Sequence, residues 1–212
     1  MKKVRNIIAL LLCAILLVGA CVAGTVAYLT SQSEVVNTFT VGKVIITLDE
    51  RDVDNDDNKE DNVTVDDVTR DKANKYKLIP GQHYEKDPVI HVDSTSESCW
   101  VFVKVINDIE KFEAKTTAGD NAYTDIAGQI DANKWTPLED VDNVYYMEYT
   151  KNQSDKDLEV FKEFKLADNA ESVGGWGNID DETTITVTGY AVQKEGFAAA
   201  IDAWNATFGD NT

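Results

Sequence analysis

The 212-residue chain carries 20 basic and 38 acidic side chains, a formal charge of −18, and 43% of its residues are hydrophobic. This length and apolar content are typical of one well-filled folded domain. The strong negative charge repels phosphate backbones and anionic lipid headgroups, so nucleic acid is excluded as an expected ligand, whereas cations and basic partners are favoured.

The N-terminal region has the pattern of an export segment. Lys2, Lys3 and Arg5 precede residues 7–29, which contain no charged side chain. Without these three cations the rest of the chain holds 17 basic against 38 acidic residues, a formal charge of −21. Contact with the membrane is therefore expected only through the N-terminal segment.

Three fates of this export segment remain open. Small residues before Tyr28 favour cleavage by a signal peptidase after Ala27, which makes residues 1–27 a signal peptide and residues 28–212 the mature domain. A second reading takes Cys21 as the lipidated N-terminus of a lipoprotein, although the residues that follow it stay apolar. A third keeps the segment as an uncleaved anchor, because more than about 18 apolar residues can span a bilayer.

Cysteine placement argues against disulfides. Cys13 and Cys21 lie in the export segment, and Cys99 is alone in the rest of the chain, so the processed domain cannot form an intramolecular disulfide. Cys99 begins an apolar stretch with no cationic neighbour before Lys104, which predicts a buried and inert thiol.

The first predicted strand covers residues 39–48, which are rich in β-branched side chains. Residues 49–75 follow, with many acidic and few large apolar side chains, and predict a flexible, solvated insert.

Within this insert, Asp52, Asp54 and Asp56 place carboxylates at alternate positions, as a calcium loop does. Asp57 stands where such a loop has glycine, and Val63 stands where it has a bidentate glutamate. We therefore expect a solvated linker with only weak calcium binding, and no dedicated metal or cofactor site.

The remaining elements predict an all-β fold with a terminal helix. Residues 78–81 form a proline–glycine turn, and strands are expected at residues 99–106, 144–150, 158–166 and 183–192. Phe197, Ile201, Trp204 and Phe208 recur at helical spacing, which predicts an amphipathic helix over residues 196–208 that packs onto a sheet. Short strands separated by turns indicate a β-sandwich.

No motif for catalysis is recognisable. The chain has two histidines, His83 and His91, which lack the spacing of a metalloprotease pair, and no serine lies in a nucleophile elbow. We therefore expect surface histidines with satisfied hydrogen bonds and a protein that is not an enzyme.

Several stretches, taken in order, resemble the TasA/camelysin family. They are GTVAYLT (residues 24–30), NTFTVG (37–42), LIPG (78–81) with Asp87-Pro88, CWVFVKV (99–105), and TVTGYAVQ (186–193) leading into Asp202-Ala203-Trp204. The resemblance spans nearly the whole chain.

This resemblance implies a jelly-roll-like β-sandwich, cleavage by a dedicated signal peptidase, and secretion to the surface or extracellular matrix of a Gram-positive bacterium. It also implies assembly into biofilm-matrix fibres, in which copies join head-to-tail as a homopolymer and contact other matrix proteins. The donor strand would begin at Tyr28 and run to about residue 40, and it would insert into the next copy by β-augmentation. The side chains expected to fill the acceptor groove are Leu29, Val35, Val36, Phe39 and Val41.

Two departures limit what the resemblance implies. The acidic insert at residues 49–75 has no counterpart in the family pattern, and the protease activity described for camelysin-like members is not carried over because no metal site is recognisable. A monomeric anchored adhesin or binding domain is the alternative function. A secreted hydrolase is a third, and it would depend on His83 or His91.

Overall fold

A computed structural model describes residues 3–6, 8, 11–16, 42–53, 63–65, 68–115, 125–180 and 182–209. The chain divides into two units, Met1–Val41 and Gly42–Thr212. In the first unit residues 3–6 and 11–16 are helical. Of the helices in the described ranges, none is long and apolar enough to cross a membrane. The expected boundary after Ala27 lies outside the described residues.

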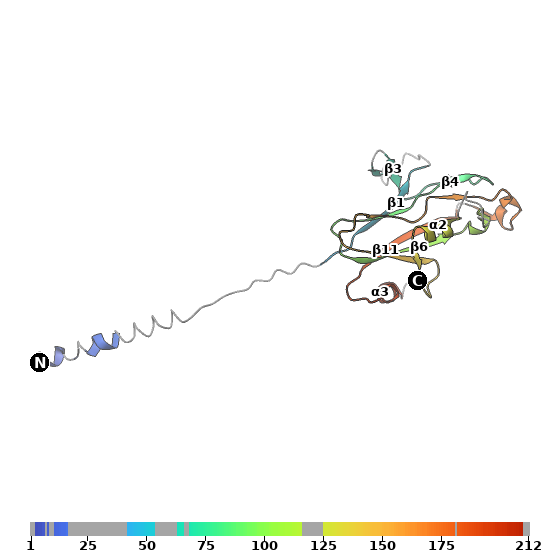
Figure 1. The fold of residues 1–212 in the computed structure, drawn as a ribbon. Coiled ribbons are helices and arrows are strands. Elements are labelled where there is room, and N and C mark those ends of the chain that lie inside the picture. Colours follow the sequence, from blue (N-terminus) through green and yellow to red (C-terminus); the bar gives the residue numbers. More distant parts are fainter. Residues whose placement is uncertain are drawn as a thin grey trace. The chain divides into compact units, whose positions relative to one another are not determined.

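The second unit consists mainly of antiparallel β-strands (Figure 1). The strands are β1 (Ile46–Arg51), β2 (Val63–Val65), β3 (Val68–Asp71), β4 (His83–Glu85), β5 (Val89–Val92), β6 (Cys99–Asn107), β7 (Thr136–Pro137), β8 (Val144–Tyr149), β9 (Asp157–Glu159), β10 (Glu163–Lys165) and β11 (Ile185–Gln193). The helices are α2 (Ile126–Ala132) and α3 (Ala200–Thr207), with 3-10 turns at Glu110–Phe112, Ala170–Ser172 and Trp176–Asn178. One sheet has the order β2-β3-β1-β5-β9, a second has β11-β6-β8-β7, and β10 pairs with β4.

The two larger sheets face each other across one hydrophobic cluster. Strand β6 supplies its odd-numbered side chains to this cluster, and Val101 and Val103 are completely buried there. Ile90 of β5 enters the same cluster from the opposite sheet. The predicted strand at residues 99–106 is therefore confirmed, and it lies inside its sheet because β11 and β8 pair with its two sides.

The opposite face of β6 packs against α3. Trp100 and Phe102 share a second cluster with Trp204, and the predicted helix face of Phe197, Ile201, Trp204 and Phe208 all lies in it. Figure 1 shows α3 on the side of the β6–β11 sheet that faces away from β1. The helix begins at Ala200, later than predicted, because Gly196 has φ 97° and Ala199 is extended, with φ −137° and ψ 157°, so neither has helical dihedral angles.

Helix α2 was not predicted from the sequence, and its N-terminus is completed by one adjacent residue and by one that is distant in sequence. Asp125 accepts a hydrogen bond from the Gly128 N–H (3.0 Å), as an N-cap residue does. The buried carboxylate of Glu113 accepts another from the Ile126 N–H (3.1 Å). Burial raises the pKa of Glu113, although the bonds from Ile126 and Asn107 oppose that shift.

The expected single strand at residues 158–166 is two strands in different sheets. Strand β9 pairs with β5, whereas β10 pairs with β4. Val160 and Phe161, between them, are both completely buried, so the in–out alternation of one strand is interrupted where the chain passes from sheet to sheet.

The acidic insert differs from the expected solvated loop where it is described. Strand β1 continues to Arg51, and β2 and β3 form a hairpin that pairs with its end. Glu50 and Asp71 are buried, at 5% and 1% exposure, and Asp71 Oδ1 accepts hydrogen bonds from the Lys72 and Ala73 N–H groups. Charged residues enter the fold here because each has a partner. Residues 54–62 and 66–67 lie outside the described ranges.

Candidate functional site

Among the strands that the structure describes, β11 is one of the two edge strands of its sheet. The Asp108 N–H donates to the Thr184 carbonyl (3.0 Å) and the Lys194 N–H to the Ser98 carbonyl (2.9 Å), so even-numbered residues of β11 point their backbone groups toward β6. By alternation, odd-numbered residues from Ile185 to Gln193 direct their N–H and C=O groups outward. In the described part of the chain no strand pairs with that side of β11.

The hydrophobic core is incompletely covered along this edge. Val44, Ile46 and Leu48 at the start of β1, and Ile185 and Val187 of β11, reach the core cluster but are only partly buried. Of the residues of β1, only Glu50 and Arg51 pair with β3. The first part of β1 therefore also has an open edge in the described structure.

The two open edges lie next to each other. A Cβ added at Gly189 of β11 would come 3.2 Å from Ile90 Cδ1 and 3.6 Å from Ile46 Cδ1. We call this region the β1–β11 seam, which consists of Val44, Ile46, Leu48 and the odd-numbered residues of β11. It combines unpaired backbone groups with half-buried apolar side chains, the two features that an added strand uses.

The chain leads from the N-terminal segment into β1 at one end of the seam. A Cβ at Gly42 would come 2.9 Å from Glu97 Cγ and 3.6 Å from Gln193 Oε1, so the Gly42 backbone lies against the last residue of β11. The buried Ser96 hydroxyl accepts from the Ile45 N–H (3.0 Å) and donates to the Ile45 carbonyl (3.2 Å). The point where the N-terminal segment leaves the domain is therefore held in place.

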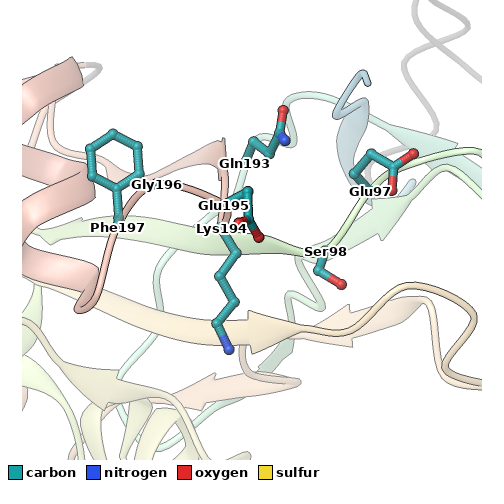
Figure 2. Close-up of a pocket in the computed structure, with 7 residues that line it drawn as sticks. All are labelled: Glu97, Ser98, Gln193, Lys194, Glu195, Gly196 and Phe197. Carbon is teal, nitrogen blue, oxygen red and sulfur yellow. The ribbon is translucent and has the colours of Figure 1, made fainter. Parts of the chain in front are cut away.

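A cavity of about 680 Å³ lies at the same end of the seam, lined by Glu97, Ser98 and residues 193–197 (Figure 2). Figure 2 shows Phe197 beside α3, with Gln193 and Lys194 on opposite sides of the chain. Lys151 Nζ is 2.7 Å from Glu97, and Lys194 pairs with Glu148, so these charges are already neutralised. The seam therefore ends in an open cavity with a mostly polar lining.

Both histidines lie within hydrogen-bond distance of carboxylates, as expected for satisfied surface histidines. His83 Nδ1 is 3.2 Å from Glu163. His91 lies between Asp157 (2.7 Å) and Asp49 (3.1 Å) on the outer face of its sheet. Burial opposes protonation of His91, but hydrogen bonds to the two carboxylates outweigh it and raise its pKa. Arg70 bonds the same Asp49, and this network joins β1, β3, β5 and β9.

The sequence-predicted site residues fall mostly outside the described ranges. These are Ala27 and Tyr28 at the cleavage site, the donor residues Leu29, Val35, Val36, Phe39 and Val41, and Asp54 and Asp56 of the calcium candidate. Asp52 is described and half-buried. No group of three or more His, Cys, Asp or Glu residues in the described ranges is arranged to hold a metal.

The structure thus adds the seam, which sequence reasoning missed. Periodicity identifies residues 183–192 as a strand but cannot show that it lies at an edge, because edge position depends on which strands pair. Comparison with protein-family models, with curated proteins and with solved structures found no match for this chain.

Proposed function

We propose that this chain is a secreted structural protein of a bacterial surface or biofilm matrix, with a jelly-roll-like sandwich that assembles head-to-tail into fibres. Residues 28–41 of one copy would add as a strand to the β1–β11 seam of the next copy. The observation that supports this most is the open edge of β11 beside half-buried core residues. A head-to-tail contact that does not close produces a filament.

The length of the donor segment suits this role. Residues 28–41 are 14 residues, which span about 46 Å when extended, whereas the nine residues of β11 span about 30 Å. About five residues of this segment, roughly 16 Å of extended chain, therefore remain to cross between two copies. Gly42 lies beside Glu97 and Gln193, so the segment would leave from the end of the seam.

The side chains of the donor segment also suit the seam. Leu29, Val35, Phe39 and Val41 are all odd-numbered and would share one face of an extended strand. That face would cover the partly buried Ile46 and Val187. The even-numbered Val36, Thr38 and Thr40 would face away, so of the five expected groove residues Val36 alone would lie on the other face. Main-chain hydrogen bonds would supply affinity, and the alternation would set the register.

A charge-matched pair of donor variants tests the proposal. Val35→Asp with Phe39→Asp places two carboxylates on the face that enters the core, and it should abolish fibres. Thr38→Asp with Thr40→Asp adds the same charge on the other face and should leave fibres intact. Protein secreted from cells would be examined by electron microscopy and by sedimentation. Fibres in both variants would refute donor insertion.

An acceptor variant tests the other half of the contact. Ala191→Pro removes an N–H group that points away from β6, so the pairing of β11 with β6 is retained but the open edge loses a donor. We expect a folded monomer that does not polymerise by itself. A wild-type chain that stays monomeric at high concentration, with an uncleaved or lipidated N-terminus, would instead favour the anchored binding domain.

A further inference from the structure

A buried lysine, a buried carboxylate and a half-buried carboxamide meet at the end of β1, away from the seam. Lys86, between β4 and β5, is 8% exposed, and Glu50 of β1 is 5% exposed. Lys86 Nζ is 2.5 Å from Glu50 Oε2, and Asn74 Nδ2 is 2.9 Å from Glu50 Oε1. One carboxylate therefore holds an amine and a primary amide, one on each of its oxygens.

The Asn74 amide is fixed at both ends. Its Oδ1 accepts a hydrogen bond from the Val53 N–H (2.8 Å), and its Nδ2 also donates to the Arg51 carbonyl (2.8 Å). Lys86 Nζ lies 5.9 Å from the centre of the Tyr76 ring, which forms one wall of the site. Lysine side chains are rarely buried to this degree unless they have a partner, and the partner of Lys86 is Glu50.

We propose that Lys86 and Asn74 join in an intramolecular isopeptide bond. The Lys86 Nζ amine attacks Asn74 Cγ, so the Nζ–Cγ bond forms and the Cγ–Nδ2 bond breaks. Glu50 takes the proton from Nζ and delivers it to Nδ2, which leaves as ammonia. The Val53 N–H stabilises the negative charge that develops on Oδ1. The reaction needs no oxidant or other co-reactant.

The bond would tie the segment that follows β3 to the segment that precedes β5. It would close residues 74–86 into a covalent ring beside the β2–β3 hairpin and restrict the unfolded chain, as a disulfide does. The processed domain has no cysteine pair for that purpose. This inference is independent of the proposed polymerisation.

The test is tryptic peptide mapping by mass spectrometry. The protein is taken from cells that express the full chain. We expect peptide 73–75 linked to peptide 78–104, because trypsin cannot cleave after a modified Lys86. The linked pair should weigh less than the sum of its parts by one ammonia, about 17 Da. Succinimide formation at an asparagine loses the same mass, so the branched peptide and the missed cleavage at Lys86 are the deciding signals.

Glu50→Gln keeps the shape of the side chain but removes the proton acceptor, and Asn74→Ala removes the electrophile. Both variants should yield separate peptides 73–75 and 78–86. If folded wild-type protein, checked by circular dichroism, also yields only these separate peptides after prolonged incubation, the proposal is wrong. A linked peptide at full yield in Glu50→Gln would overturn the role of Glu50.

Discussion

Replacement of Phe102 by alanine should destabilise the domain strongly, because α3 covers the outer face of β6. Phe102 is completely buried, and its ring centre lies 5.1 Å from that of Trp204 and 6.4 Å from that of Phe208. Truncation of a buried phenylalanine costs about 3–5 kcal/mol through lost contacts and a residual cavity. In a domain of this size, that loss lowers the Tm by roughly 6–20 °C.

Ile106 provides a matched control, since it lies on the same strand and the same face but is 41% exposed beyond the helix. Ile106→Ala should cost less than about 1 kcal/mol. Urea denaturation followed by tryptophan fluorescence and far-ultraviolet circular dichroism would measure both variants. Equal, small losses for the two would mean that α3 does not pack on β6, which would refute this account of the second cluster.

Three further predictions concern single polar or reactive groups. The pKa of His91 is raised, so its contribution to the free energy of unfolding is complete below the unfolded pKa of 6.5 and is lost as pH rises through the folded pKa. His91→Gln should therefore make the free energy of unfolding, measured by denaturation at a series of pH values, depend less on pH. Tyr149→Phe should be neutral or stabilising by up to about 1 kcal/mol in the same assay, because the buried hydroxyl has no hydrogen-bond partner among the described residues; a loss above about 1 kcal/mol would contradict this. Burial raises the pKa of the Cys99 thiol to about 11, so a thiol reagent should label it only in denaturant; rapid labelling of folded protein would argue against burial.

The elements that the sequence predicted correctly are those whose apolar side chains are regularly spaced. Strand β6 directs odd-numbered side chains to the core and Trp100 and Phe102 to the cluster with α3, and the helical spacing from Phe197 to Phe208 is equally regular. These patterns report which side chains share a face, which depends on local geometry alone. The prediction for residues 158–166 failed because Val160 and Phe161 are both buried where the chain changes sheets.

The burial of charged residues was the feature least predictable from composition. Glu50 and Asp71 come from the insert at residues 49–75 that the sequence predicts to be solvated. Both are buried, Glu50 with Lys86 of another segment as its partner and Asp71 with neighbouring backbone N–H groups as partners. The cost of burying a charge is offset only by such a partner, which is identified by three-dimensional proximity.

The sequence by itself determined the uncharged apolar stretch at residues 7–29, the presence of a single cysteine after it, and the strands and helix face with regular apolar spacing. Only the tertiary structure decided that β11 is an edge, that the core is half-covered along the β1–β11 seam, and that Glu50 joins Lys86 to Asn74. The physical reason is that periodicity specifies which face of an element is buried, whereas strand pairing and charge partners depend on which distant segments meet.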